Sequence, residues 1–474
     1  MRVRGTRGPR RASGPSRPAV AAACLGGLAV AAGLAVRAAD PPDPLHDYRE
    51  TAGRLIEAAR ADRFAWERIA ELTDTFGHRL SGSPQLEAAL RWAADEMRKD
   101  GLENVRLEPV MVPRWVRGRE SATLVQPGPS ELAMLGLGNS VGTRPEGVEA
   151  PVLVVDGFEA LEARASEVQG RIVLYDVPFT TYRETVRYRT SGASRAARHG
   201  AVAVLLRSVG PTGLRTPHTG AVRYDDGAPR IPAAALAAED SARIARVAAR
   251  GRPVVVRLHM EARFLPDSES ANLVGEVRGR ERPEEIVLVG GHIDSWDVGT
   301  GALDDAGGCI VTWEALRLVR KLGLRPRRTL RVVLFTNEEN GLRGGRAYRD
   351  RHAAELDRHV LALESDSGVF RPRGFGFSGG AQARAIVQGI AGLLAPIGAT
   401  AIGPAGGGAD INPTVEAASV PAMSLDVDGS KYFVYHHTPA DTVERLDPEE
   451  VSLCAAAVSV MAYVVADIPE RLPR

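Results

Sequence analysis

Side chains of the types that can bind metal ions follow two short apolar segments of the sequence, residues 286–289 and 330–335. Apolar segments of this length predict buried strands, and α/β sheets place their chemistry at strand ends. An imidazole with several carboxylates suits zinc or a similar divalent ion. The first cluster has one imidazole and four carboxylates and the second is a pair of adjacent glutamates: His292, Asp294, Asp297, Asp304 and Asp305, then Glu338 and Glu339.

The adjacent glutamates meet a specific requirement of amide hydrolysis. Cleavage at neutral pH needs a hydroxide-like nucleophile, a Lewis acid for the carbonyl oxygen and a base for the proton of the water. Two zinc ions about 3.5–4 Å apart would supply the first two, and a carboxylate has to bridge ions that lie so close. One glutamate could then bind metal while its neighbour is the free base. There are simpler alternatives. Glu338 and Glu339 could be exposed residues at the protein surface, and Asp304 and Asp305 could be an acidic pair at the N-terminus of a helix.

Four segments, in this order, resemble the signature segments of the co-catalytic dizinc aminopeptidase family. The resemblance is strongest to the plasma glutamate carboxypeptidase branch, also called carboxypeptidase Q, and it covers the chain from about residue 64 to its end. The segments are GGHIDSWDVGTGALDDAGG from residue 290, NEENGLRGG from 337, ESDSG from 364 and YHHTPADT from 435.

The resemblance implies two zinc ions per chain and a role for each matched residue. Glu338 would be the general base and proton shuttle. Asp294 would lie behind the metal ligands and orient the imidazole of His292 through its N–H. The five ligands would be His292 and Asp366 for one ion, Glu339 and His437 for the other, and Asp304 as the bridge.

Some of these assignments stay open on the sequence alone. Glu364 precedes Asp366 by two positions and would face the same side of a strand, so it is the alternative ligand. His436 adjoins His437 and could take its place. The glycine-rich stretch that ends at Asp410 resembles a loop on the substrate side of the site, although a plain flexible loop explains it almost as well. For Asp305, capping of a helix or a position behind the metal ligands explains the residue better than direct metal binding.

Strands and helices alternate along the C-terminal part of the sequence. This order predicts an α/β fold with a mainly parallel (mixed) sheet sandwiched by helices, and the resemblance implies the zinc-exopeptidase fold. We expect the strand at 374–377 to form an edge of the sheet. The predicted strands are 270–277, 286–289, 330–335, 360–363, 374–377 and 421–426, and the predicted helices are 302–323, 339–356, 382–394 and 448–466.

The pattern of predicted strands and helices in residues 113–262 differs from that in the rest of the chain. Short β-rich pieces alternate with alanine-rich helices, and proline and glycine interrupt them. We interpret this segment as a β-rich α+β domain inserted between residues 39–112 and 263–474 of a catalytic domain; in the resemblance it corresponds to a protease-associated domain. Its histidines His199 and His218 are isolated in the sequence, so we expect structural or exposed roles for them.

The first 38 residues have the layout of a secretory signal. A basic segment is followed by an apolar run over 19–36 and by small residues that suit cleavage, and an uncleaved membrane anchor is the alternative. We therefore expect a secreted, periplasmic or envelope location. Without the seven arginines of this segment the chain has 53 basic and 59 acidic residues, a net charge of −6, which gives no case for nucleic acid. Outside the segment, Cys309 and Cys454 are too few for a disulfide scaffold, and the sequence does not tell whether they pair.

These observations favour a secreted dizinc exopeptidase that hydrolyses dipeptides or short peptides. Aminopeptidase, dipeptidase and carboxypeptidase activities all stay open. The alternatives are a single-zinc transferase similar to glutaminyl cyclase and a catalytically silent receptor or scaffold of the same fold. The complete ligand set argues against both. The resemblance also suggests a homodimer, and we expect no stable membrane insertion if the signal is cleaved.

Overall fold

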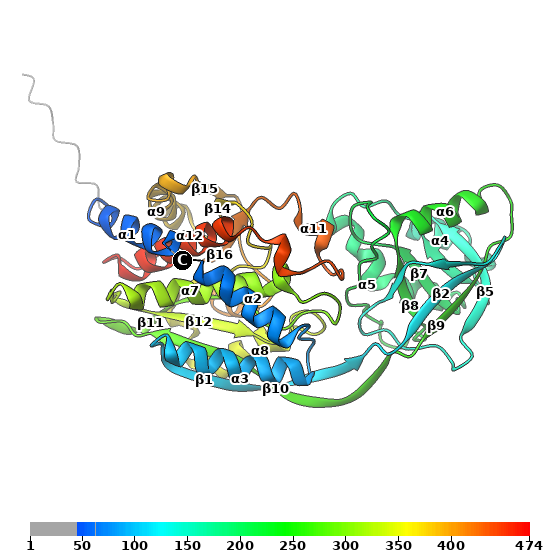
Figure 1. The fold of residues 1–474 in the computed structure, drawn as a ribbon, viewed down its shortest axis with the longest axis horizontal. Helices are drawn as coiled ribbons and strands as arrows, with labels where there is room; N and C mark the ends of the chain where they lie inside the picture. Colours follow the sequence, from blue (N-terminus) through cyan, green and yellow to red (C-terminus); the bar gives the residue numbers. More distant parts are fainter. Residues whose placement is uncertain (1–44, 62) are drawn as a thin grey trace, which may run out of the picture. The chain divides into compact units, whose positions relative to one another are not determined.

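The computed structural model describes residues 45–61 and 63–474. The predicted signal segment, residues 1–38, lies outside the described residues. Two eight-stranded sheets organise the described part of the chain (Figure 1). We call the first sheet and its helices the first lobe, and residues 120–260, which form the second sheet, the second lobe.

The first sheet is mixed and has a parallel centre, as the sequence predicts. Strands β12, β11, β13 and β16 run parallel, whereas β1, β10 and β14 join the sheet through antiparallel pairs. In order across the sheet, the strands are β1 (Glu103–Val116), β10 (Arg263–Val277), β12 (Arg328–Phe335), β11 (Arg282–His292), β13 (His359–Glu364), β16 (Ala422–Val427), β14 (Pro372–Ser378) and β15 (Ala401–Gly403).

The prediction that residues 374–377 form an edge strand is wrong. Strand β14 lies between β16 and β15, so the three-residue strand β15 forms that edge. A strand of three residues is too short to show an alternation of apolar and polar side chains. The sequence therefore gave no sign of a neighbour beyond β14.

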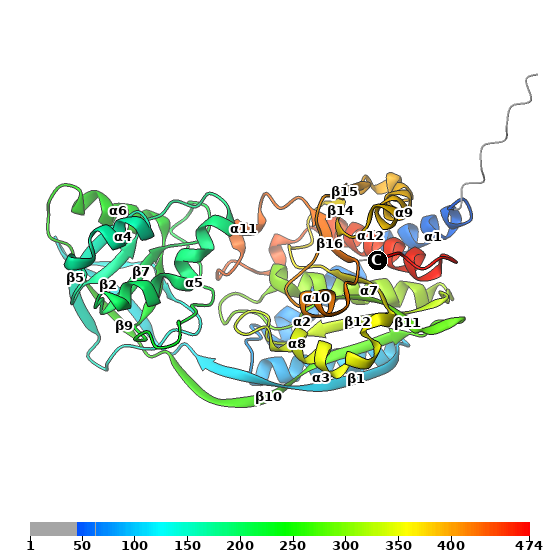
Figure 2. The same cartoon turned by 180° about the vertical axis from the view of Figure 1, so that it is seen from behind.

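Helices cover both faces of the first sheet, which explains why its central strands are continuous apolar runs. In β11, Val287 and Val289 pack into the larger core, and Ile286 and Leu288 face the opposite side. The larger core contains α1 (Tyr48–Arg60), α2 (Phe64–Phe76), α3 (Pro84–Lys99), α7 (Gly307–Lys321), α9 (Ala381–Gly392) and α12 (Pro448–Asp467); the opposite face carries α8 (Arg343–Arg351) and α10 (Asn412–Ala418), which Figure 2 shows.

Helix α12 lies at the centre of the larger core. Among the described residues it is the one helix long and apolar enough to cross a membrane, but 89% of its most apolar stretch is buried inside the protein. The N-terminal helices pack around it. The hydroxyl of Tyr48 donates to Asp467 over 3.2 Å, and the indole N–H of Trp66 donates to the carbonyl oxygen of Leu446 over 3.1 Å. Cys454 on α12 and Cys309 on α7 are both buried and free.

The second sheet joins the first through one long ribbon. Strands β1 and β10 pair antiparallel from Glu103 opposite Glu276 to Val116 opposite Arg263, and the chain beyond both ends enters the second lobe. The second lobe contains β2 (Glu120–Gln126), β3 (Ser130–Leu132), β4 (Met134–Gly136), β5 (Val148–Val155), β6 (Ile172–Tyr175), β7 (Ala203–Arg207), β8 (Ala233–Leu236) and β9 (Val255–Met260), with α4 (Phe158–Ala163), α5 (Tyr182–Arg198) and α6 (Ala238–Ala248).

His359, the first residue of β13, is a buried histidine at the amino end of its strand, away from the metal centre at the carboxyl ends. Its Nε2 lies 2.9 Å from the hydroxyl of Tyr348, and its Nδ1 lies 3.1 Å from the backbone oxygen of Glu355. Burial, and next the positive charge of Arg331, lower its pKa from 6.5 to about 4. Because the folded pKa lies below the unfolded one, His359 favours folding above the unfolded pKa, and this contribution is lost as the pH falls towards the folded pKa.

We therefore expect His359→Asn to flatten the pH dependence of stability. Between pH 7 and pH 5, His359 should account for about 2 kcal/mol of the decrease in the free energy of unfolding. Urea unfolding of both proteins at the two pH values measures this difference. An equal decrease in wild type and variant would show that His359 does not titrate in this way.

Candidate metal centre

The strand ends of the first sheet bring the predicted residues together. His292 ends β11 and lies in register with Phe335, the last residue of β12, so the glutamate pair follows directly beside it. Glu364 ends β13 on the other side of β11. After β11 the chain comes back to this edge of the sheet at η2 (Ala302–Ala306), a short π-helical turn. This turn contains Asp304 and leads into α7. All these segments meet at the carboxyl edge of the parallel strands.

One group of ligand atoms surrounds His292. Its Nε2 lies 3.2 Å from an oxygen of Asp304 and 3.4 Å from an oxygen of Asp366. The three residues offer ligand atoms within 4.8 Å of one another, which is close enough to share one metal ion. The Nδ1 of His292 donates to the backbone oxygen of Asp294 over 2.9 Å, while the Asp294 carboxylate is 3.8 Å away. Asp294 therefore orients the imidazole through the N–H of its Nδ1, and the acceptor is the backbone oxygen of Asp294.

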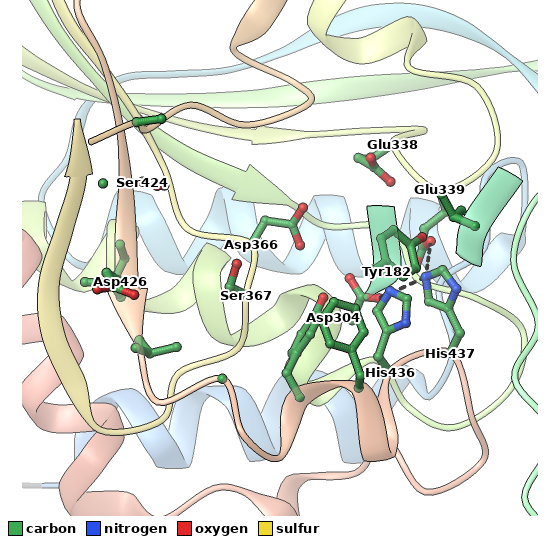
Figure 3. A pocket seen from close by; sticks show the side chains of 18 of the residues that line it. Tyr182, Asp304, Glu338, Glu339, Asp366, Ser367, Ser424, Asp426, His436 and His437 are labelled. Carbon is green, nitrogen blue, oxygen red and sulfur yellow. Dashed lines mark ion pairs between the residues drawn. The ribbon is translucent and has the colours of Figure 1, made fainter. Parts of the chain in front are cut away.

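A second group surrounds His437 and shares Asp304 with the first. The Nε2 of His437 lies 3.1 Å from Asp304 Oδ2 and 3.1 Å from Glu339 Oε2. Figure 3 shows Asp304 between Asp366 and the adjacent residues His436 and His437, with Glu339 beside His437. One carboxylate between two ligand groups is the arrangement that a bridge between two ions requires.

His436 competes with His437 for the second group. The two rings stack with centroids 3.5 Å apart, and His436 Nε2 lies 3.5 Å from Asp304. His437 contacts both Asp304 and Glu339, whereas His436 contacts Asp304 and leaves its buried Nδ1 without a hydrogen bond among the described residues. The geometry favours His437 as the ligand.

The structure also distinguishes the roles of Glu364 and Asp366. One oxygen of Glu364 accepts hydrogen bonds from the backbone N–H groups of Asp410 and Ile411, over 3.1 and 2.9 Å. Glu364 therefore holds the loop that contains Asp410, and Asp366 is the carboxylate next to His292. Asp410 is buried behind Glu364, and burial and the charges of Glu364 and Glu338 raise its pKa well above the usual value.

The remaining aspartates of the first motif have other partners. The Asp294 carboxylate accepts the backbone N–H groups of Glu338 over 3.0 Å and Glu339 over 3.4 Å, so it fixes the position of the glutamate pair. Asp305 accepts the backbone N–H groups of His292 and Gly308, which is the capping role expected for it. Asp297 lies apart from this group and pairs with Arg117.

Glu338 lies at the wall of a cleft of about 870 Å³ and keeps part of its surface exposed there. Its side chain forms no ion pair with the described residues. Burial of the carboxyl group, and next the negative charges of Asp366 and Glu339, raise its pKa well above the usual value. A carboxylate with a raised pKa beside a ligand group can take up a proton, which suits a general base.

The donor set fits divalent cations. Asp304 Oδ2 and Glu339 Oε1 are buried without a hydrogen bond among the described residues, and burial, followed by the charge of Asp304, raises the pKa of Glu339 to about 7. Buried carboxylates concentrated in this way are unfavourable unless cations offset their charge. Nitrogen and oxygen donors from histidine and carboxylate side chains suit zinc.

The second lobe contributes residues that the sequence did not identify. The Nδ1 of His437 donates to the backbone oxygen of Thr219 over 3.2 Å, and the Nδ1 of His218 lies 2.8 Å from the backbone oxygen of His436. Tyr182 and Arg189 of α5 line the same cleft as Glu338. No local pattern marks these residues, because only the packing of the two lobes brings them to the site.

Comparisons with known proteins place this geometry in a family. The sequence model that describes peptidase family M28 matches residues 272–462 of this chain. Carboxypeptidase Q from Mus musculus is 46% identical over 435 residues, which are 91% of this chain and 92% of that protein. Carboxypeptidase Q from Homo sapiens is 47% identical over 420 residues, 89% of each.

Solved structures agree with the family match. A peptidase M28 precursor from Shewanella amazonensis shares 35% sequence identity and has a TM-score of 0.87, covering 90% of this chain and 98% of that one. A zinc aminopeptidase from Bacillus subtilis has the same fold at 20% identity, with a TM-score of 0.64 over 86% of this chain and 96% of that one. The prediction from the four sequence segments is thus confirmed, and the chain belongs to peptidase family M28.

Proposed function

We propose that the chain is an exopeptidase that uses two zinc ions to hydrolyse dipeptides or short peptides. The observation that carries the proposal is the pair of ligand groups that share Asp304, with the uncommitted carboxylate of Glu338 beside them. The zinc ligands would be His292, Asp304 and Asp366 for one ion, and Asp304, Glu339 and His437 for the other. When bound, the two ions would lower the pKa of a water molecule and polarise the carbonyl group of the substrate.

Glu338 is the general base in this proposal. It takes a proton from the water that attacks the peptide carbonyl carbon, and it returns that proton to the nitrogen of the leaving amine, so each cleavage consumes one water. Asp294 supports this role through the backbone, because it fixes the N–H groups of both glutamates. His437 is held in position by the carbonyl oxygen of Thr219.

The organisation of the chain follows the same proposal. Residues 39–112 and 263–474 form the catalytic domain, and residues 113–262 form an inserted domain similar to protease-associated domains. The separate sheet of residues 120–260 supports this division. A secreted or envelope location follows from the predicted signal in residues 1–38, and a homodimer from the family resemblance.

Two alternatives predict other outcomes. A transferase similar to glutaminyl cyclase would use a single zinc ion, and a silent receptor would lack ligands or the base. The second ligand group and Glu338 favour the hydrolase over both.

Zinc content and hydrolysis of a small substrate panel test the proposal. We expect about two zinc ions per chain by elemental analysis, and cleavage of free dipeptides that chelator treatment abolishes and zinc restores. N-blocked peptides and aminoacyl anilides in the same panel show which terminus is read. One zinc ion with cyclisation of N-terminal glutamine would favour the transferase, and a metal-free protein without turnover would leave a binding protein.

A further inference from the structure

Arg189 is the one buried arginine of the described residues that lacks its usual acceptors. It is 7% exposed, and no carboxylate lies within ion-pair distance of its guanidinium among the described residues. A buried cation without an anion is unfavourable. The other buried arginines are satisfied: Arg68, Arg117, Arg328 and Arg331 form ion pairs, and Arg79 donates to four backbone oxygens.

The guanidinium of Arg189 is held rigidly and still has unused donors. Its Nη2 donates to the hydroxyl of Tyr182 over 2.8 Å, its Nη1 lies 3.4 Å from the backbone oxygen of Thr219, and its buried Nε has no partner. Gly220 lies directly against it, since a Cβ at that position would be 2.2 Å from Nη1. The group is therefore fixed in place without an anionic partner.

The neighbouring metal ligand does not supply the missing acceptor. Nη1 of Arg189 lies 3.4 Å from the Nδ1 of His437, but that nitrogen also lies 3.2 Å from the oxygen of Thr219. Because a carbonyl oxygen can only accept, the Nδ1 carries the proton and cannot accept a second one from Arg189. Arg189 therefore lines the cleft next to the metal centre as an unpaired cation.

A second guanidinium lines the same cleft. The backbone N–H of Arg223 donates to the backbone oxygen of Thr190, which places Arg223 next to Arg189 along the wall formed by the second lobe. The side chain of Arg223 is exposed and forms no hydrogen bond or ion pair with the described residues. The same cleft also contains the proposed metal ligands Asp304 and Asp366, and Glu338. The second lobe thus presents two guanidinium groups to the cleft that holds the metal centre.

We propose that Arg189, assisted by Arg223, binds the free α-carboxylate of the peptide substrate. The inference rests on the proposed exopeptidase function and narrows its substrate class to dipeptides and short peptides whose C-terminus lies close to the cleaved bond. A guanidinium binds a carboxylate through two parallel hydrogen bonds.

The test compares one dipeptide with its C-terminal amide. For wild type, Arg189→Gln and Arg223→Gln, kcat/KM is measured for both substrates, together with zinc content and thermal stability. We expect Arg189→Gln to lower the preference for the free carboxylate about 100-fold, and Arg223→Gln to lower it less. The loss should appear mainly in KM, because the carboxylate is bound equally in the ground state and the transition state.

Two further variants make the test specific. Arg187→Gln removes an exposed arginine of the same helix that does not line the cleft, and it should leave the preference unchanged. Arg189→Lys keeps the charge without the planar fork, and it should retain part of the preference.

Several outcomes would overturn the inference while the proposed function stands. One is an unchanged preference in Arg189→Gln. Another is an equal loss of kcat for acid and amide, which would show that Arg189 acts on the reaction or on His437 instead. If wild type cleaves neither substrate, the proposed function fails, and calorimetric binding of the two dipeptides then decides. Equal affinity for acid and amide would exclude a carboxylate site.

Discussion

The variant Glu338→Gln is expected to lose about 10²–10⁴-fold in kcat while it keeps its zinc. Glutamine has the same shape as glutamate but cannot take up the proton of the attacking water. The Asp294 carboxylate holds the backbone N–H of residue 338, which the substitution leaves intact. The fold and the ligand group around His437 should therefore be unaffected. Steady-state kinetics on a free dipeptide and elemental analysis of the same preparation measure both quantities.

The zinc content of the variant distinguishes a general base from a metal ligand. A variant that has lost zinc as well as activity would show that Glu338 is a ligand. A variant that has nearly wild-type kcat would assign the proton transfer to another group. Asp410 is the carboxylate to examine next, because it is buried near Glu338 and both its oxygens lack hydrogen bonds among the described residues.

Asp304→Asn is expected to lose zinc from both ligand groups and to lower kcat/KM on the order of 10³-fold or more. Asp304 is the residue that contacts both His292 and His437, at 3.2 and 3.1 Å. An amide offers one neutral oxygen where the carboxylate offers two charged ones, so it cannot bridge two cations. A metal that binds the folded state stabilises it, so added zinc should raise the Tm of wild type much more than that of the variant.

Asp297→Asn is the matched control for this prediction. Asp297 belongs to the same sequence motif, but its carboxylate pairs with Arg117 outside the ligand groups. We expect this variant to keep its zinc and to respond to added zinc as wild type does. If Asp304→Asn retained two zinc ions and wild-type kcat/KM, the bridging role would be wrong.

The residues at the strand ends could be predicted because each follows an apolar segment directly. His292 ends β11 and the glutamate pair follows β12, and two neighbouring parallel strands must bring their carboxyl ends to one edge. The family resemblance also favoured Asp366 over Glu364, which the sequence alone left open. The structure gives the physical reason, since the Glu364 side chain is held by the backbone N–H groups of Asp410 and Ile411.

The contribution of the second lobe could not be predicted in this way. Arg189 and Thr219 lie more than two hundred positions before His437, and helical periodicity reports only that one face of α5 is buried. His218 was expected to be structural or exposed, and it is indeed buried against the backbone of His436. Its effect on the site is through that backbone contact, which no side-chain pattern can signal.

The packing of the first helix against the last has a consequence for the order of folding during synthesis. Helix α1 contacts α12 through Tyr48 and Asp467, which are separated by 419 positions. Helix α1 must therefore wait for almost the whole chain before its apolar face is covered by this partner, whereas α3 packs on β1 and β10, which are made much earlier. The second lobe is continuous in sequence and can form its own sheet as soon as residue 260 has been made.

Nascent chains should thus contain a folded second lobe attached to an incomplete first one. Domains that fold as units during synthesis shorten the time in which apolar surface is exposed, but α1 does not have this advantage. The apolar face of α1 should therefore need protection until α12 is complete.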